Sequence, residues 1–555
     1  MKQWFKSGAP WIWLNGGAVA LCMIMVVGLI GLIAVRGFSH FWPAEVLRTT
    51  VIDKQEQSQT VIGELVRSET IPAAVARDAG YSVPEGAELV TRHLIKQGNR
   101  DITGNDFMWY VATGMGEWDY PQDIMVLERR QWGNFYGFAQ QIKAHGEVIA
   151  ERDDAQFWQE LEQRVARSVS LHEEIKAIEN GAIGDVNHAL EGLRLARKKL
   201  TINNADVATI NRAEAEFAER RAELQTHYEV AKAERDALYQ RLERDTLVMQ
   251  VADGQTVLVP LHNIVRVSRP NALSVWGKLA EYSSRFWGFL VDDPREANTE
   301  GGIFPAIFGT VTLVLVMSIM VTPFGVLAAI YLHEYARQGP VLRLIRISVY
   351  NLAGVPSIVY GVFGLGFFVY FLGGSIDELF YPESMPTPTF GTPGLFWASL
   401  TLALLTLPVV IVSTEEGLSR IPKTIRQGSL ALGATKSETL WKVVVPLATP
   451  AMMTGLILAV ARAAGEVAPL MLVGVVKLAP SLPIDSHYPY LHLDQKIMHL
   501  GFYIYDVGFQ SPNVEAARPL VYATAMTLVM LIIILNLAAI KIRNNLREKY
   551  RSASD

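Results

Sequence analysis

Residues 422–446 read PKTIRQGSLALGATKSETLWKVVVP, a polar segment between two long apolar ones. Pro422 can occupy the first turn of a helix, because the N–H that it lacks would have no helical partner there. Gly433 is a natural left-handed stop, since glycine adopts positive φ without steric cost. Thr435 and Glu438 have the Ser/Thr-x-x-Glu spacing of a capping box, which begins the next helix. The stretch therefore predicts a helix, a break and a second helix.

The first of these helices is short and amphipathic. Leu430, Ala431 and Leu432 supply apolar surface beside several basic residues. A helix of this kind suits insertion into a groove of a partner protein.

The same stretch superficially resembles a phosphate-binding loop over residues 428–437. Such a loop needs Gly-Lys-Ser/Thr in immediate succession, whereas Ala434 and Thr435 separate Gly433 from Lys436. No Walker motif occurs elsewhere in the sequence. If the protein uses ATP, a partner must hydrolyse it.

The sequence around this segment has the composition of a membrane protein. Of 555 residues, 50% are apolar and 19% are charged, and mean hydropathy is +0.20; soluble chains are about 25% charged. A helix needs about 20 apolar residues to cross a bilayer. The expected spans are Leu14–Val35, Phe304–Leu332, Val349–Leu372, Leu395–Ser413, Ala451–Val476 and Leu520–Ile540. This pattern excludes a soluble enzyme, and the net charge of −5 gives no basic footprint for nucleic acid.

The single cysteine, Cys22, lies inside the first apolar run. One cysteine excludes an intramolecular disulfide and a cysteine-based metal site. Lys2 and Lys6 precede this run as in a signal peptide, but the run is long and lacks a small-x-small cleavage site. We expect an uncleaved anchor.

Basic residues in short loops predict the orientation of the spans. The loops after the second and fourth spans and the tail after the sixth are rich in Lys and Arg, whereas the loop after the third carries Asp377, Glu378 and Glu383. Both termini are therefore expected in the cytoplasm. The segment 37–302 is expected on the opposite, periplasmic side.

This middle segment has two kinds of sequence. Short strands are expected at 107–111, 124–127 and 135–142, and a β-hairpin at 247–251 and 256–259, turning at Asp253-Gly254. Between them, residues 147–245 are rich in charge and free of proline. From Leu193 to Leu242 apolar residues recur at steps of three and four, which fits an imperfect coiled-coil seam. Breaks at 180–181, 184–185 and 203–204 favour an antiparallel helical hairpin. We expect an α+β domain that carries this hairpin, either as a solvated insertion or as a docking arm for a partner.

Charged residues inside the fifth span mark a candidate substrate path. Arg462 and Glu466 stand four residues apart, so they share a helical face and can pair. Charges at such depth cost at least about 2.5–3.5 kcal/mol each on insertion scales. One interpretation is a structural salt bridge; the other is transient compensation of a passing anion, for which Arg offers a fork of donors. Gly465 would permit close backbone approach at this point.

Residues 427–446 resemble the coupling motif of ABC-importer permeases: Glu-Ala-Ala, three residues, Gly, nine residues, then Ile-x-Leu-Pro. Gly433 and Pro446 stand in register, Val443 and Val445 are conservative replacements, and 427–429 depart from Glu-Ala-Ala. Two further stretches, 351–361 (NLAGVPSIVYG) and 462–470 (RAAGEVAPL), look like the PstA-type permease subunit of the bacterial phosphate ABC importer. The resemblance covers residues from about 300 to 545 and the first span.

The resemblance implies an α-helical, six-span, type I-like importer permease in the bacterial inner membrane. It implies an ATPase coupling surface at Gln427, Gly428, Ser429, Leu432, Gly433, Ala434 and Pro446. It also implies a second homologous permease, two ATP-binding cassette ATPases and a periplasmic phosphate-binding protein as partners. The chain would bind no cofactor and would be no enzyme, because the substrate leaves unchanged.

The expected organisation is a tail and first span at 1–36, the insert at 37–302, a permease domain at 303–545 with a coupling loop at 414–450, and a tail at 546–555. Two alternatives stay open at this point. One is a permease for another oxyanion, such as sulfate or molybdate. The other is a membrane scaffold that acts through its helical arm.

Overall fold

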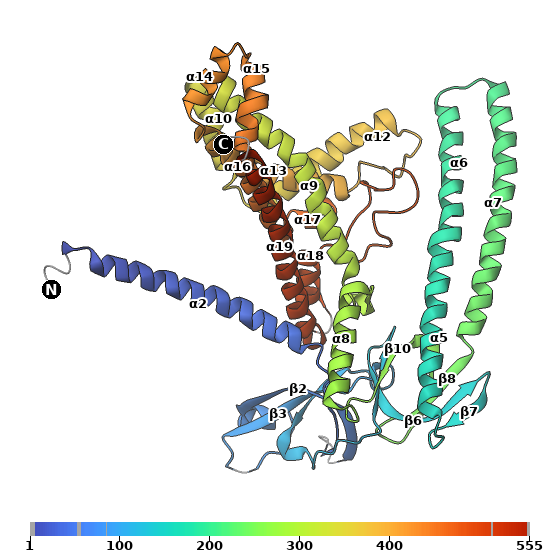
Figure 1. Cartoon of the computed structure of the whole chain (residues 1–555). Coiled ribbons are helices and arrows are strands. Elements are labelled where there is room, and N and C mark those ends of the chain that lie inside the picture. The colour runs from blue at the N-terminus through green and yellow to red at the C-terminus, as the bar shows by residue number, and fades with distance from the viewer. Residues whose placement is uncertain (1–5, 53–56, 85, 512–513, 552–555) are drawn as a thin grey trace. The chain divides into compact units, whose positions relative to one another are not determined.

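The computed structural model describes residues 6–52, 57–84, 86–511 and 514–551, which form two compact units (Figure 1). Unit 1 comprises Met1–His40 and Phe289–Asp555, and unit 2 comprises Phe41–Gly288. Lys2 and residues 552–555, which belong to the expected tails, lie outside the described residues.

The C-terminal boundary predicted for the insert, residue 302, lies beyond the end of unit 2 at Gly288. Residues 289–302 belong to unit 1, because their polar groups bond within it. The backbone N–H of Ile303 donates to Phe289 O at 2.9 Å, and the Tyr503 hydroxyl donates to Asn298 O at 2.9 Å.

Six helical segments of the described chain are long and apolar enough to cross a membrane, which confirms the expected number. They are Pro10–Ser39, Phe304–Tyr335, Ser357–Phe380, Leu395–Ser419, Lys436–Gly465 and Ala517–Leu546.

Unit 1 is built around four long helices that pack in the order α9, α13, α16, α19 (Figure 1). Their shared core includes Leu313, Leu402 and Ala459, all fully buried. The elements are α2 (Ala9–Ser39), β11 (Pro294–Arg295), η4 (Glu296–Asn298), β12 (Glu300–Gly301), α9 (Phe304–Ile330), η5 (Tyr331–Tyr335), α10 (Pro340–Leu352), α11 (Ser357–Phe363), η6 (Gly364–Gly373), α12 (Gly374–Phe380), α13 (Leu395–Ser419), α14 (Lys423–Ala431), α15 (Lys436–Thr439), η7 (Leu440–Val444), α16 (Val445–Gly465), α17 (Leu470–Val473), α18 (Leu500–Tyr505), η8 (Asp506–Gln510) and α19 (Val514–Arg551). Of the η segments, η4 is a 3₁₀ turn and the other four are π-helical.

The third span begins later than expected. The prediction of Val349–Leu372 joined the end of α10 to the next helix, but the two are separate. α10 ends at Leu352, and Pro356 has a non-helical ψ of 135° just before α11. A proline also disfavours helical backbone at the residue before it, so the two helices do not join. The span therefore runs to Phe380 and includes Asp377, which had been assigned to the acidic loop. The Asp377 carboxylate is buried and accepts the backbone N–H of Phe390 at 2.8 Å and of Gly391 at 2.6 Å.

The fifth span also differs from the predicted Ala451–Val476. Its helix starts at Lys436 after the capping box and ends at Gly465. Glu466 has an extended ψ of 137°, which ends the helix there. The π-helical turn η7 ends at Val444, two residues before Pro446. This wider turn accommodates the proline, which cannot donate a backbone hydrogen bond to the preceding turn.

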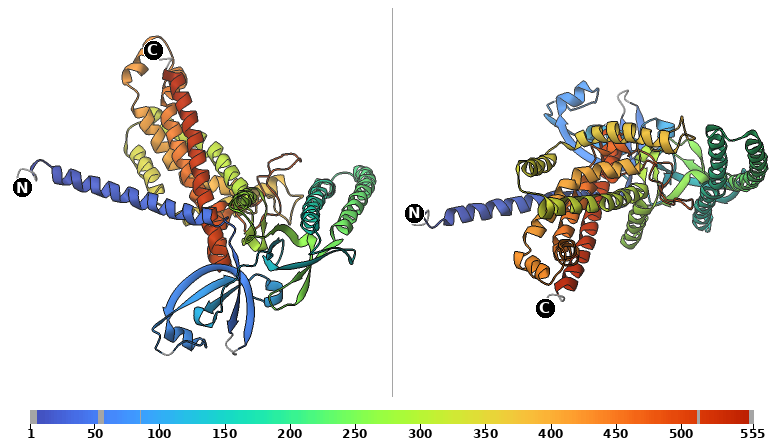
Figure 2. Two further views of the ribbon diagram at one scale, coloured as in Figure 1. Left: turned by 60° about the horizontal axis from the view of Figure 1, so that its bottom comes forward. Right: turned by 90° about the horizontal axis from the view of Figure 1, so that it is seen from above.

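Unit 2 contains two antiparallel sheets (Figure 2). One has the order β1-β2-β3-β4, and the other has the order β10-β5-β6-β8-β9, with β7 paired to β6. The second sheet encloses the main core of this unit, which includes Leu127, Phe135, Ile142 and Leu247. The elements are β1 (Val46–Ile52), β2 (Ser58–Pro72), α3 (Ala73–Asp78), β3 (Leu89–Lys96), α4 (Arg100–Thr103), β4 (Phe107–Val111), η1 (Ala112–Gly114), β5 (Met125–Arg129), β6 (Phe135–Ala144), β7 (Glu147–Glu151), α5 (Phe157–Ile178), η2 (Glu179–Ile183), α6 (Gly184–Ile202), α7 (Val207–Leu242), β8 (Asp245–Gln250), β9 (Thr256–Pro260), η3 (Leu261–Asn263), β10 (Ile264–Ser268) and α8 (Val275–Val291), whose last turn belongs to unit 1.

The short strands predicted from the sequence are present as β4, β5 and β6, and the predicted hairpin is β8–β9 with Gly254 at φ +87°. The helical arm is shorter than 147–245. Residues 147–151 form β7, because Ala150 points into the sheet core. The helices cover 157–242.

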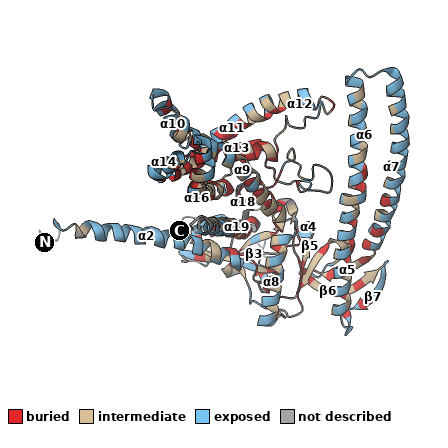
Figure 3. Ribbon diagram, turned by 45° about the horizontal axis from the view of Figure 1, so that its top comes forward, coloured by how far each residue is buried: buried red, intermediate tan, exposed pale blue. Residues whose placement is uncertain are grey.

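The arm is a helical hairpin with one turn. The π-helical segment η2 joins α5 to α6 without a break, so the predicted interruptions at 180–181 and 184–185 are wrong. The turn falls at 203–206, where Asn204 has φ +50° and Asp206 caps α7 by accepting the Thr209 N–H. Most of the outward surface is exposed (Figure 3). Buried residues on α7 stand seven or four apart, at Leu224, Ala231, Leu238 and Leu242. Supercoiling of the two helices stays a prediction.

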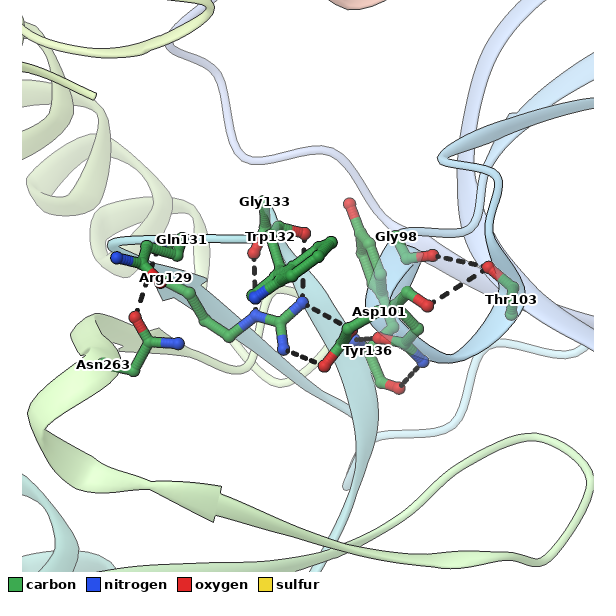
Figure 4. Close-up of polar contacts among 10 residues, drawn as sticks. Gly98, Asp101, Thr103, Arg129, Gln131, Trp132, Gly133, Tyr136 and Asn263 are labelled. Carbon is green, nitrogen blue, oxygen red and sulfur yellow. Dashed lines mark hydrogen bonds and ion pairs between the residues drawn. The ribbon is translucent and has the colours of Figure 1, made fainter. Parts of the chain in front are cut away.

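The loop between β3 and β4 is fastened to the β5–β6 hairpin by a buried polar network (Figure 4). The guanidinium of Arg129, 3% exposed, binds both carboxylate oxygens of Asp101 at 2.9 Å. The Asn99 side chain accepts the N–H of Tyr136 at 2.8 Å and donates to its carbonyl at 2.9 Å. These contacts hold the two sheets together within unit 2.

Candidate functional site

The loop between α13 and α16 folds as a helix, a break and a second helix, as the sequence predicts. α14 follows Pro422, and Gly433 has φ +87°. The Thr435 hydroxyl accepts the Glu438 N–H at 3.2 Å, and the Glu438 carboxylate accepts the Thr435 N–H at 3.0 Å. The loop is narrower than the expected 414–450, because α13 continues to Ser419 and the next helix already starts at Lys436.

The residues predicted to form a coupling surface are only partly brought together. Gln427 and Gly428 are exposed on α14, and Leu432 is 91% exposed just after it. Ser429 and Ala434 are half-buried, and the Ser429 hydroxyl lies 2.8 Å from that of Thr439. Pro446 lies apart from them, half-buried in the first turn of α16.

Large apolar side chains of this loop face outward. Ile425 and Leu430 are exposed together with Leu432. A large exposed apolar patch is typical of an interaction site on a protein surface. The inner side of the loop is packed, with Ile421, Leu440 and Val444 in one buried cluster. The loop therefore presents an apolar outer surface on a fixed base.

Arg426 fastens α14 to two spans. Its Nη2 lies 2.8 Å from Glu334 Oε1 in η5, and it donates to Leu418 O at 2.8 Å. Its Nη1 donates to Ile421 O at 3.2 Å. Both charged side chains are largely shielded, since Arg426 is 18% and Glu334 13% exposed.

Lys436 makes a second link from this loop to η5. Its Nζ donates to the Glu334 carbonyl at 2.6 Å and lies 4.5 Å from the centre of the Tyr335 ring. The Glu334 side chain is also held by His333, whose Nδ1 lies 3.0 Å from Oε1. Glu334 thus receives contacts from α14, through Arg426, and from the start of the next helix, through Lys436.

The predicted substrate-path residues lie at the opposite end of α16. Arg462 is in its last turn, and its Nε lies 3.5 Å from Oε1 of Glu466. Glu466 follows the helix, so the two are not both inside the span as predicted. Both side chains are partly accessible, at 33% for Arg462 and 19% for Glu466, and Gly465 has open space beside it.

Tyr360 lies on α11 and is buried. Its hydroxyl donates to Leu352 O at 2.5 Å, which links α11 to the end of α10. The adjacent Gly361 packs so tightly on Pro469 that a Cβ there would lie 2.7 Å from Pro469 Cα. The structure therefore joins the stretches 351–361 and 462–470, which are separate in the sequence, beside one ion pair.

Sequence reasoning missed Glu334 and Tyr360 and assigned no role to Arg426. One sequence feature could have pointed to Glu334: it is a carboxylate at the end of an apolar run, within Tyr331–Tyr335. Tyr360 offered none, because an aromatic residue in a span is usual for packing.

The sequence matches a family model described as binding-protein-dependent transport system inner membrane component, over residues 321–546. This match defines the class as a multi-pass inner membrane permease, which works with ATPase and substrate-binding partners. Among curated proteins, the Mycobacterium leprae phosphate transport system permease protein PstA is 36% identical over 43% of this chain and 69% of its own length. Phosphate transport system permease protein PstA 1 of Mycobacterium tuberculosis is 33% identical over 48% of this chain and 79% of its own. The chain belongs to the PstA-type permease family.

Two solved structures are also similar. One shows inward-facing conformations of the MetNI methionine ABC transporter, with a TM-score of 0.33 and 18% identity over 43% of this chain and 94% of that chain. The other is a bacterial ABC transporter involved in the import of alginate, with a TM-score of 0.31 and 13% identity over 43% and 78% of the two chains.

Proposed function

We propose that this chain is the transmembrane permease subunit of an ATP-driven importer that moves inorganic phosphate from the periplasm to the cytoplasm by alternating access. The observation that carries this function is the exposed coupling loop, with Gly433 at φ +87° and an apolar outer surface at Leu430 and Leu432. The PstA-type relatives, whose names specify phosphate, supply the substrate. The oxyanion and scaffold alternatives are not favoured.

The coupling surface accounts for how ATP drives transport. Partner ATPases hydrolyse the nucleotide, and this chain binds no cofactor. Gln427, Gly428 and Leu432 form the outer contact surface of α14. Closure of the ATPase dimer displaces α14, and the displacement reaches the spans through the buried base of the loop. The chain itself moves its substrate without changing it and so is not an enzyme.

The remaining partners follow from the importer class. A second homologous permease completes the pathway, two ATPases bind the two coupling loops, and a periplasmic phosphate-binding protein delivers the substrate. Lys and Arg beside the coupling loop favour its location in the cytoplasm, because cytoplasmic loops carry an excess of positive charge. Both termini then lie in the cytoplasm and unit 2 in the periplasm.

The Arg462–Glu466 pair supports a role in the substrate path. Its side chains are partly accessible, and a guanidinium offers paired donors to phosphate oxygens. Glu466 neutralises Arg462 when the path is empty, which weakens retention of the anion. Open space beside Gly465 leaves room for a substrate at the backbone.

A reconstituted assembly tests this function. The full chain is co-expressed with the permease, ATPase and binding protein encoded with it, purified, and inserted into proteoliposomes. ATP-dependent uptake of radiolabelled phosphate is then measured with excess unlabelled phosphate, sulfate or molybdate as competitor. We expect only unlabelled phosphate to compete. If sulfate or molybdate suppressed the uptake as strongly as phosphate does, the proposed substrate would be wrong. If the assembly showed no ATP-dependent uptake, the proposed function would be wrong.

A further inference from the structure

The ion pair between Glu334 and Arg426 differs from other pairs of the coupling loop. Arg420–Glu416 and Lys442–Glu438 are exposed and join residues one helical turn apart. Such pairs contribute little, because water screens them. Glu334 and Arg426 are largely shielded and join segments 92 residues apart, the end of the α9 span and the middle of α14.

Arg426 connects α14 to more than one span. The same guanidinium that binds Glu334 donates to Leu418 O and Ile421 O, at and just beyond the C-terminal end of α13. A charged donor makes hydrogen bonds that are shorter and stronger than neutral ones. Displacement of α14 therefore acts directly on the ends of both α9 and α13.

Glu334 also contacts the fifth span. Its backbone carbonyl accepts Lys436 Nζ, from the first residue of the span that includes α16. The three spans α9, α13 and α16 also pack against one another. Glu334 and Arg426 thus lie where the coupling helix meets three packed spans.

We propose that Glu334 and Arg426 form the strut through which the coupling helix moves the spans, and that they are positioning residues for coupling, not for ATPase binding. This role rests on the proposed importer function. Because the strut is an ion pair between shielded side chains, it transmits the displacement of α14 to α9. Without it, α14 still presents its outer surface to the ATPase but shifts without moving α9.

The test measures phosphate taken up per ATP hydrolysed by the full assembly in proteoliposomes. The variants are Glu334→Gln, Arg426→Gln and their combination, with Glu416→Gln as a matched control for an exposed carboxylate of the same region. We expect each strut variant to retain the ATPase and its hydrolysis, while uptake per ATP falls about tenfold. This change corresponds to about 1.4 kcal/mol, close to the lower end of what a hydrogen bond to a charged group contributes. The double variant should lose no more than either single one, because the two act as one unit. The control should keep the wild-type ratio.

A second readout is independent of the substrate. In a Cys22→Ser background, a spin label at Ile319→Cys, on the exposed side of α9, reports motion of that helix when vanadate traps nucleotide. We expect the label to respond in the wild type and to respond much less in Glu334→Gln, in which the link from Lys436 to the backbone carbonyl of residue 334 is kept. A response in Glu334→Gln like that of the wild type, or an unchanged uptake per ATP, overturns the strut. If the wild-type label responds but no phosphate is taken up, the proposed function is wrong. The comparison of the label in the wild type and in Glu334→Gln still tests the strut in that case. If Glu334→Gln does not assemble, Arg426→Gln decides by the same ratio: a lowered ratio supports the strut and a wild-type ratio overturns it.

Discussion

Arg462 closes the last turn of α16, and its Nε lies 3.5 Å from Oε1 of Glu466, the first residue after the helix. A pair four residues apart inside a helix would lie on a continuous face, whereas here Glu466 sits on extended backbone. The carboxylate can therefore move without disturbing the helix. This geometry suits a counter-charge that releases Arg462 when an anion arrives.

Removing the charge of Arg462 should abolish transport. We expect Arg462→Gln to stop phosphate uptake, while the assembled complex and its basal ATP hydrolysis persist. Arg462→Lys should keep only a fraction of uptake, because the charge survives but the fork of donors does not. Uptake and ATPase rate measured on the same proteoliposomes check both results.

Two outcomes would contradict this role. Loss of assembly in Arg462→Gln would mean that the ion pair is structural, and normal transport would exclude both roles. Arg420→Gln serves as the control, since Arg420 is 78% exposed and pairs with Glu416 one helical turn earlier.

Gly433 should be required for coupling because of its conformation. At φ +87° a side chain with a Cβ is strained by roughly 1–2 kcal/mol, and a β-branched one by more. We expect Gly433→Val to reach the membrane but to lose co-purification of the ATPase or uptake driven by it. Gly433→Asn should retain both, because Asn tolerates this region and open space surrounds the position. Equal loss in both variants would mean that size, not backbone conformation, matters.

The insert should be separable if the cut respects the boundaries of the units. We expect deletion of residues 41–288, with a flexible joint, to preserve membrane insertion and at least partial uptake, since unit 1 keeps its own core. A deletion extended to Asn298 should instead destabilise the permease. Asn298 is fully buried, and its amide donates to Lys477 O at 2.9 Å. Cellular abundance and uptake of the two deletions compare the outcomes, and degradation of the shorter deletion would show that the insert is structurally necessary.

Arg129 should dominate the stability of unit 2. Replacing it by Met removes the bidentate pair with Asp101 and leaves the carbonyls of Trp132 and Gly133 without this donor, at a cost of about 2 kcal/mol. We expect the amides of β5 and β6 to lose protection in hydrogen exchange on the full chain. Arg194→Met, which breaks an exposed pair with Glu191, should leave this protection unchanged, because water screens an exposed pair. Similar effects of the two substitutions would argue against the network.

The local features of the coupling loop were predictable because each depends on residues close in the sequence. A capping box needs only Thr435 and Glu438 at their spacing, and the break needs only a glycine at 433. The six apolar spans were predictable for the same reason, since hydropathy is summed over consecutive residues. The predicted ends of the third and fifth spans were wrong. Pro356 and Glu466 ended helices inside runs whose apolar character continued.

Contacts between distant residues were decided only by the tertiary structure. Nothing in the sequence links Glu334 to Arg426, Gly361 to Pro469, or Asn298 to Tyr503, because each pair meets through the packing of separate helices. The sequence by itself established the number of spans and the helix-break-helix form of the coupling loop, because these follow from local hydropathy, propensity and capping, whereas the class of fold came from the resemblance of its motifs to a known family. The tertiary structure alone decided where charges meet, because an ion pair depends on the direction in which packed helices carry their side chains, and that direction is a property of the whole unit.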